Sequence, residues 1–166
     1  MAKAWGAGGN CPCLALLRHY RLIWDSVKYE PGKLVVVAYD REGHPAMSDS
    51  VCTAGQPYRL VATVDKHSVC ANGTEYAFVQ LKVVDRQGNL CPDSSERIRF
   101  RVDGCGEFVA SANGDPTDLN PFHISEMPVF HGQLMAIVRG NGRVGEFLFE
   151  ASADGLLPCK IKIKTK

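Results

Sequence analysis

The sequence predicts an all-β protein: a complete immunoglobulin-like β-sandwich preceded by part of a second β-sandwich domain. Several short segments are rich in β-branched residues, and many of them alternate between apolar and polar positions. Gly, Pro, Asn and Asp separate these segments at intervals of roughly 8–12 residues, as is typical of a sandwich. We also find no amphipathic window with helix caps at either end.

The first β-rich region ends near residue 54. Residues 33–39 form a β-branched run that follows Pro31-Gly32, and after the turn at 40–45 residues 47–53 can return as its partner strand. We expect residues 14–54 to hold about three strands, too few for a closed sandwich, and residues 1–13 to be an unstructured or foreign extension. An apolar face that includes Leu22, Trp24, Val35 and Val37 would then need a cover, which predicts self-association or local disorder.

Residues 56–166 contain about seven predicted strands, enough for one complete sandwich. Arg97, Arg99 and Arg101 alternate with Ile98, Phe100 and Val102, which places the arginines outward and the apolar side chains inward. Alternating lysines in the last strand protect it from edge-to-edge pairing. Six of these strands are placed at 58–65, 76–85, 97–102, 134–139, 144–151 and 160–164, and tight turns are expected at 86–89 and 140–142.

Composition excludes several classes of function. The 166 residues include 19 Lys and Arg against 18 Asp and Glu, a formal charge of +1, so we expect no nucleic-acid partner. No apolar run approaches the ~20 residues that cross a bilayer, so we expect no membrane partner. Arg18 interrupts the apolar run at 14–17, and we therefore identify no signal peptide.

The chain carries no recognisable catalytic, cofactor or metal motif. Its seven cysteines are scattered, the only close pair is Cys11 and Cys13, and the five histidines lack metal-ligand spacing, so we interpret the thiols as reduced and partly buried. No two carboxylates are placed reliably together for glycoside hydrolysis. The sequence at 104–106, Gly-Cys-Gly, is interpreted as a turn between strands, because no base for a nucleophilic thiol is identified.

Three features leave alternatives open. Asn72-Gly73-Thr74 matches a glycosylation acceptor, although Asn-Gly is also what a tight turn requires. The connection at 113–131 is long and is either a binding surface or a structural crossover whose aromatic residues cap the sandwich. Trp24, Tyr29 and Tyr39 could form a sugar-stacking platform or pack at a core or domain interface.

Two stretches carry a resemblance to a known family. Residues 20–34, which include Trp24, Tyr29 and Pro31-Gly32, resemble the penultimate β-domain of bacterial glycoside hydrolase family 2 β-galactosidases, as do Val37-Ala38-Tyr39. Thr53-Ala54-Gly55-Gln56-Pro57 resembles the linker that opens the C-terminal immunoglobulin-like domain of that family. Further matches follow in the same order at 78–85, 88–92, 98–100, 113–117 and 130–132.

The resemblance implies a non-catalytic role. Enzymes of this family hydrolyse β-galactosides with two glutamates of a TIM barrel that precedes these domains, and such a barrel needs about 250 residues. We therefore expect a C-terminal accessory module whose partner is the catalytic domain or a second copy, and possibly carbohydrate. A stand-alone carbohydrate-binding module and β-galactosidase activity in this chain are the alternatives. The resemblance also implies export to the periplasm.

Overall fold

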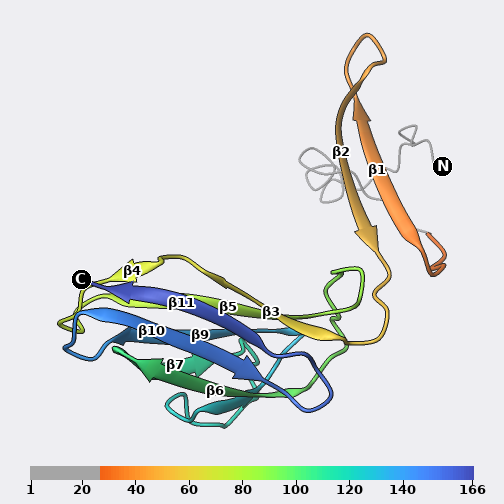
Figure 1. Cartoon of the computed structure of the whole chain (residues 1–166). Coiled ribbons are helices and arrows are strands. Elements are labelled where there is room, and N and C mark those ends of the chain that lie inside the picture. The colour runs from red at the N-terminus through yellow and green to blue at the C-terminus, as the bar shows by residue number, and fades with distance from the viewer. Residues whose placement is uncertain (1–26) are drawn as a thin grey trace, which may run out of the picture.

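The computed structural model describes residues 27–166, and every regular element among them is a β-strand. Figure 1 shows an extended hairpin and a layered body of strands, joined by one connecting segment. Over the described residues, no helix has the length and apolar character needed to cross a membrane. The predicted extension at 1–13 and the first strand expected within 14–54 lie outside the described residues.

The hairpin consists of β1 (Lys33–Tyr39) and β2 (Pro45–Cys52), which pair antiparallel. Side chains of successive residues point to opposite faces of a strand, so each face of this two-stranded sheet receives part of the apolar run of β1. Leu34 pairs with Val51 on one face, and Val35 pairs with Ser50 on the other. Leu34, Val35 and Val51 are all exposed, so the described residues leave both faces of the hairpin without an apolar cover.

The body is a sandwich of two sheets (Figure 1). The four-stranded sheet has the order β3 (Arg59–Val64), β5 (Tyr76–Val84), β9 (Gln133–Gly140) and β7 (Gly106–Ala112). The five-stranded sheet has the order β4 (Ser68–Val69), β11 (Cys159–Thr165), β10 (Gly145–Ser152), β6 (Arg97–Gly104) and β8 (Glu126–Pro128). All neighbouring strands are antiparallel except the short β4, which runs parallel to β11.

The core lies between the two sheets. Leu81 of β5 and Phe149 of β10 are fully buried, and the ring of Phe100 stacks on Phe149 and Phe108, with centroids 6.1 and 5.4 Å apart. Burial of side chains of this size supplies most of the stabilisation of a domain. The sandwich therefore has its own hydrophobic core, whereas the hairpin has none among the described residues.

The outer face of the five-stranded sheet is a ladder of opposite charges. Lys160, Glu150 and Arg101 lie side by side across β11, β10 and β6, and Lys164 lies opposite Glu146. Exposed pairs of this kind contribute little to stability, at about 0–1 kcal/mol each, but they keep the face hydrated. The predicted outward orientation of Arg97, Arg99 and Arg101 is confirmed.

The structure confirms the all-β sandwich and the strands predicted at its centre. Three strands were not predicted, β4, β7 and β8. β4 and β8 contain only two and three residues, and β7 has a weak pattern because a bulge between Phe108 and Ala110 interrupts its alternation. The turn at 86–89 is present, but only a single bridge, Val84 to Leu90, follows it instead of a full returning strand.

Candidate functional site at the linker

The linker, residues 53–57, connects the hairpin to the sandwich and is attached at both of its ends. At the hairpin end, Thr53 donates its backbone N–H to the carbonyl oxygen of Gly32 at 2.8 Å, and its hydroxyl oxygen accepts the N–H of Gly32 at 3.0 Å. The Tyr29 hydroxyl lies 3.2 Å from the same hydroxyl. At the sandwich end, Tyr58 donates its N–H to Val84 at 2.9 Å. The linker is therefore hydrogen-bonded to the base of the hairpin at one end and to β5 at the other.

The carboxylate of Asp85 holds the middle of the linker. Its Oδ2 accepts the backbone N–H of Gly55 at 2.8 Å and the Asn89 side-chain amide at 3.0 Å. Its Oδ1 accepts the backbone N–H groups of Gln87 and Asn89 at 2.9 and 2.8 Å. Only 1% of Asp85 is exposed, so these four donors replace the water that the buried charge has lost.

The hydrogen-bond donors around Asp85 lower the pKa of its carboxyl group. The N–H of Gly55 is the strongest influence, and together with the Asn89 and Gln87 donors it lowers the pKa of Asp85 from 3.8 to about 2, although burial acts in the opposite direction. Asp85 is therefore ionised at neutral pH. The residue was missed by the sequence analysis, although an Asp that begins an Asp-Arg-Gln-Gly-Asn turn is the usual signal for side-chain acceptance of turn N–H groups.

Open clefts lie on both sides of the linker. The first has a volume of about 510 Å³ and lies between residues 54–57 and the segment 91–96. The second has a volume of about 700 Å³ and lies between the base of the hairpin, including Leu34 and Val51, and the segment 89–93. Ala54, Pro92 and Asp93 line both clefts, so the linker passes between them, with Ala54 packed against the sandwich core.

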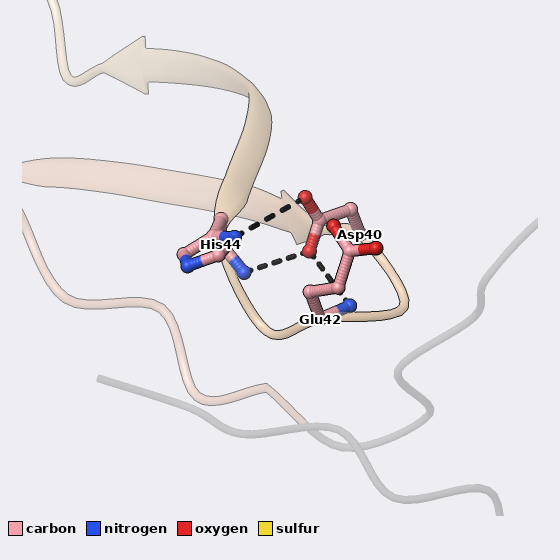
Figure 2. Close-up of side chains that lie close together, drawn as sticks. All are labelled: Asp40, Glu42 and His44. Carbon is pink, nitrogen blue, oxygen red and sulfur yellow. Dashed lines mark hydrogen bonds and ion pairs between the residues drawn. The ribbon is translucent and has the colours of Figure 1, made fainter.

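One group of metal-ligand residue types occurs in the described part of the chain. Asp40, Glu42 and His44 come together at the tip of the hairpin, and all three are exposed (Figure 2). Asp40 Oδ1 already accepts the backbone N–H groups of Glu42 and His44, at 3.0 and 2.8 Å. The carboxylate therefore orders a tight turn, which is the ordinary use of Asp at such a position.

The Gly-Cys-Gly segment forms the corner between β6 and β7, where the chain passes from one sheet to the other. Cys105 donates its N–H to Glu146 at 3.1 Å, and its thiol lies 3.8 Å from the Val144 carbonyl oxygen. The turn interpretation is confirmed. Elsewhere, burial raises the pKa of Cys91, and it raises the pKa of Cys159 to about 11, so neither thiol has the character of a nucleophile.

The connection at 113–131 is ordered by side-chain acceptors and contains β8. Asn113 donates its side-chain amide to Asp118 at 2.7 Å and to the Pro128 carbonyl at 3.1 Å. Asp118 accepts the N–H of Asn120, and that bond is the main reason its pKa is lowered. Leu119 is 95% exposed and Phe122 is 65% exposed. The connection crosses between the sheets, because β8 pairs with β6 in the five-stranded sheet whereas β7 and β9 belong to the four-stranded sheet.

The remaining predicted candidates lie apart from the linker. Asn72 occupies a turn between β4 and β5, where its side-chain oxygen accepts the N–H and hydroxyl of Thr74 at 3.1 and 2.7 Å. Tyr29 and Tyr39 are exposed, and Trp24 lies outside the described residues. Chemically, the described residues offer exposed ion pairs, tight turns and an anchored linker.

Comparison with known protein families gives two matches along the chain. Residues 60–162, which span the sandwich from β3 to β11, match the family described as glycoside hydrolase family 2 C-terminal domain 5. The chain belongs to glycoside hydrolase family 2. Residues 10–46 match a domain of unknown function, DUF4982, which reaches into the hairpin. The family resemblance noted in the sequence is therefore confirmed.

Curated relatives and solved structures agree with this assignment to glycoside hydrolase family 2. A β-galactosidase of Bacteroides ovatus is 31% identical over 140 residues, which cover 84% of this chain and 16% of the relative. A β-galactosidase of Thermoanaerobacter pseudethanolicus is 23% identical over 113 residues, 68% of this chain and 14% of the relative. The chain thus spans less than a fifth of the length of either relative.

The structural neighbours show the same fold. A β-glycosidase of Bacteroides vulgatus superimposes with a TM-score of 0.79 at 24% identity, over 84% of this chain and 18% of that one. A glycosyl hydrolase family 2 member from Bacteroides cellulosilyticus superimposes with a TM-score of 0.80 at 22% identity, again over 84% of this chain and 18% of that one.

Proposed function

We propose that this glycoside hydrolase family 2 chain acts as a non-catalytic accessory module of a β-galactosidase, where it braces the catalytic domain. The match to a C-terminal domain of the family carries this proposal. We infer the activity of the parent enzyme from the β-galactosidase relatives, of which the chain spans only a small part.

The surface of the hairpin supports the bracing role. Leu34 and Val51 are cross-strand partners and are 59% and 69% exposed, and Met47 is exposed on the same face. An isolated two-stranded hairpin is marginally stable in water, and apolar side chains gathered on one face favour an interface. We infer that another domain of the parent enzyme covers this face of the hairpin.

The chemistry of the described residues supports a non-catalytic role. Retaining glycoside hydrolysis needs two carboxyl groups about 5–5.5 Å apart that flank the glycosidic bond. Here Glu126, Glu150 and Asp154 form ion pairs with lysine or arginine on the outer face of the sandwich. The buried carboxylate of Asp85 is saturated by four donors and holds the linker.

An activity assay tests the non-catalytic part of the proposal. We expect the purified chain to release no 4-nitrophenol from 4-nitrophenyl β-D-galactopyranoside above the buffer rate, with an active β-galactosidase as the positive control. Turnover that coelutes with the chain in size-exclusion chromatography and disappears on heating would overturn the proposal and favour an enzyme.

A chimera tests the bracing part. The relative from Bacteroides ovatus can be prepared intact, truncated before the matching region, or with residues 14–166 of this chain in its place. We expect the truncation to lower the melting temperature of the enzyme and the chimera to recover at least half of the loss. If the chimera has the same melting temperature as the truncated enzyme although the sandwich of this chain is folded within it, this chain does not brace that catalytic domain.

Carbohydrate binding is a second candidate, because exposed aromatic rings can stack on sugars. Tyr29, Tyr39 and Phe122 are exposed, and they lie on three separate segments. Titration with galactose and lactose, followed by NMR shifts of residues 113–131, tests this candidate. Saturable shifts at millimolar sugar support it, and unchanged spectra count against it.

A further inference from the structure

We infer that the Asp85 carboxylate is a latch that fixes the orientation of the hairpin relative to the sandwich. The latch is the hydrogen bond from the Gly55 N–H to Asp85 Oδ2, at 2.8 Å. This inference concerns the two parts of this chain alone and stands whether or not the module braces a catalytic domain.

The position of the latch makes it effective. Thr53 is tied to the hairpin and Tyr58 is tied to β5, which leaves residues 54–57 between the two attachment points. Four residues can span about 13–14 Å when extended, so they could pivot freely if nothing held them. The contacts that hold Gly55 are the Asp85 carboxylate at its N–H and the thiol of Cys91, 3.6 Å from its carbonyl oxygen.

The surroundings leave Gly55 dependent on its hydrogen bonds. The linker lies between two open clefts of about 510 and 700 Å³, and although Ala54 packs against the sandwich core, Gly55 and Gln56 are exposed. The hydrogen bond that the Cys91 thiol donates to the Gly55 carbonyl oxygen is neutral and weak, whereas a hydrogen bond to a buried carboxylate is about twice as strong as a neutral one. The charge on Asp85 is therefore the main polar restraint on Gly55.

Position 55 offers substitutions that keep or remove the N–H donor of the latch. A Cβ at this position would lie 3.5 Å from Asp85 Oδ2, an ordinary contact, so alanine can be tolerated while the N–H donor is kept. Proline would remove the donor altogether. These two substitutions separate the hydrogen bond from the local shape of the chain.

Asp85→Asn tests the latch with little change of shape. Its single amide oxygen can keep the two turn N–H groups of Gln87 and Asn89, and its NH₂ group then faces the Gly55 N–H, donor against donor. Asn89→Ala is the matched control, because it removes one side-chain bond to Asp85 Oδ2 and leaves the Gly55 bond in place.

Hydrogen exchange of the full chain by NMR, at neutral pH, gives the readout. We expect the Gly55 amide to exchange about 10- to 100-fold faster in Asp85→Asn, and less than threefold faster in Asn89→Ala. The core amides of Val79 and Val138 report the loss of global stability, and we expect them to accelerate less than Gly55 does. The inference is overturned if Gly55 exchanges at the wild-type rate in Asp85→Asn, or if core amides accelerate as much as Gly55 does.

Small-angle X-ray scattering of Gly55→Pro and Gly55→Ala provides an independent measurement. We expect a larger radius of gyration and a broader distance distribution for Gly55→Pro, because the hairpin reorients, and a wild-type profile for Gly55→Ala. Identical profiles for both variants and the wild type would show that Asp85 does not set the orientation of the hairpin.

Discussion

The ring of Phe147 occupies the space that a side chain at position 106 would need. A Cβ built on Gly106 would lie 2.6 Å from both Cδ atoms of that ring, far inside van der Waals contact. Gly106 begins β7 directly after the corner from β6, and Phe147 belongs to β10 in the opposite sheet. The two sheets therefore approach each other closely at this corner because one partner has no side chain.

Gly106→Ala is expected to destabilise the sandwich by about 1–3 kcal/mol, because the added methyl group overpacks the core. Urea unfolding followed by circular dichroism measures the loss. The penalty should shrink in a Phe147→Leu background, where the ring is gone, and persist in Phe149→Leu. Equal penalties in both backgrounds would show that Phe147 is not the source of the strain.

Asp85 should make the chain sensitive to acid. Its pKa is lowered to about 2 in the folded state, so between about pH 4 and pH 2 the unfolded chain binds more protons at this group. The stabilisation is complete above pH 4 and is lost as the pH falls through 2. We expect the free energy of unfolding to fall less between pH 6 and pH 2.5 in Asp85→Asn than in the wild type. Parallel pH profiles would contradict this.

The hairpin should mediate self-association of the purified chain. Replacing Val51 with lysine places a charge beside Leu34, its cross-strand partner. We expect the dissociation constant measured by sedimentation equilibrium to rise about tenfold or more, since a buried valine contributes about 1.5–3 kcal/mol. Val144→Lys is the control, because Val144 is equally exposed but lies on the sandwich. Equal effects of the two changes would exclude the hairpin as the interface.

Cys159 and Cys91 should be the slowest of the described thiols to alkylate. Burial raises the pKa of Cys159 from 9.0 to about 11, so at pH 8 its thiolate fraction is about 100-fold lower than that of an ordinary thiol. Iodoacetamide labelling with peptide mass spectrometry should find the half-buried Cys52, Cys70 and Cys105 modified before these two. The rates should converge in 6 M guanidinium chloride. Rapid native labelling of Cys159 would contradict its assigned environment.

Local patterns predicted much of the fold. The alternation at 97–102 placed the three arginines outward correctly, and the run at 33–39 coincides with β1, because a period of two in a strand maps directly onto its faces. β7 was missed, since Gly106, a bulge near Val109 and small residues weaken the same pattern. The strand forms because β9 pairs with every residue of β7 except Val109, and that information is not local.

The candidate site was less predictable than the fold. The motif at 53–57 identified the linker, and turn chemistry at 86–89 could have identified Asp85 as an acceptor. No pattern joined the two, because Gly55 and Asp85 are separated by 30 residues and meet only when β3 pairs with β5.

The sequence alone determined the all-β class, the faces of the long strands, the membership of a family and the lack of a recognisable catalytic motif. Each of these depends on the order of residue types along a segment. Only the tertiary structure decided that Asp85 is a buried charge holding the linker, and that Gly106 makes room for a ring from the other sheet. Such contacts depend on which segments the sheets bring together, and burial then makes each of them energetically decisive.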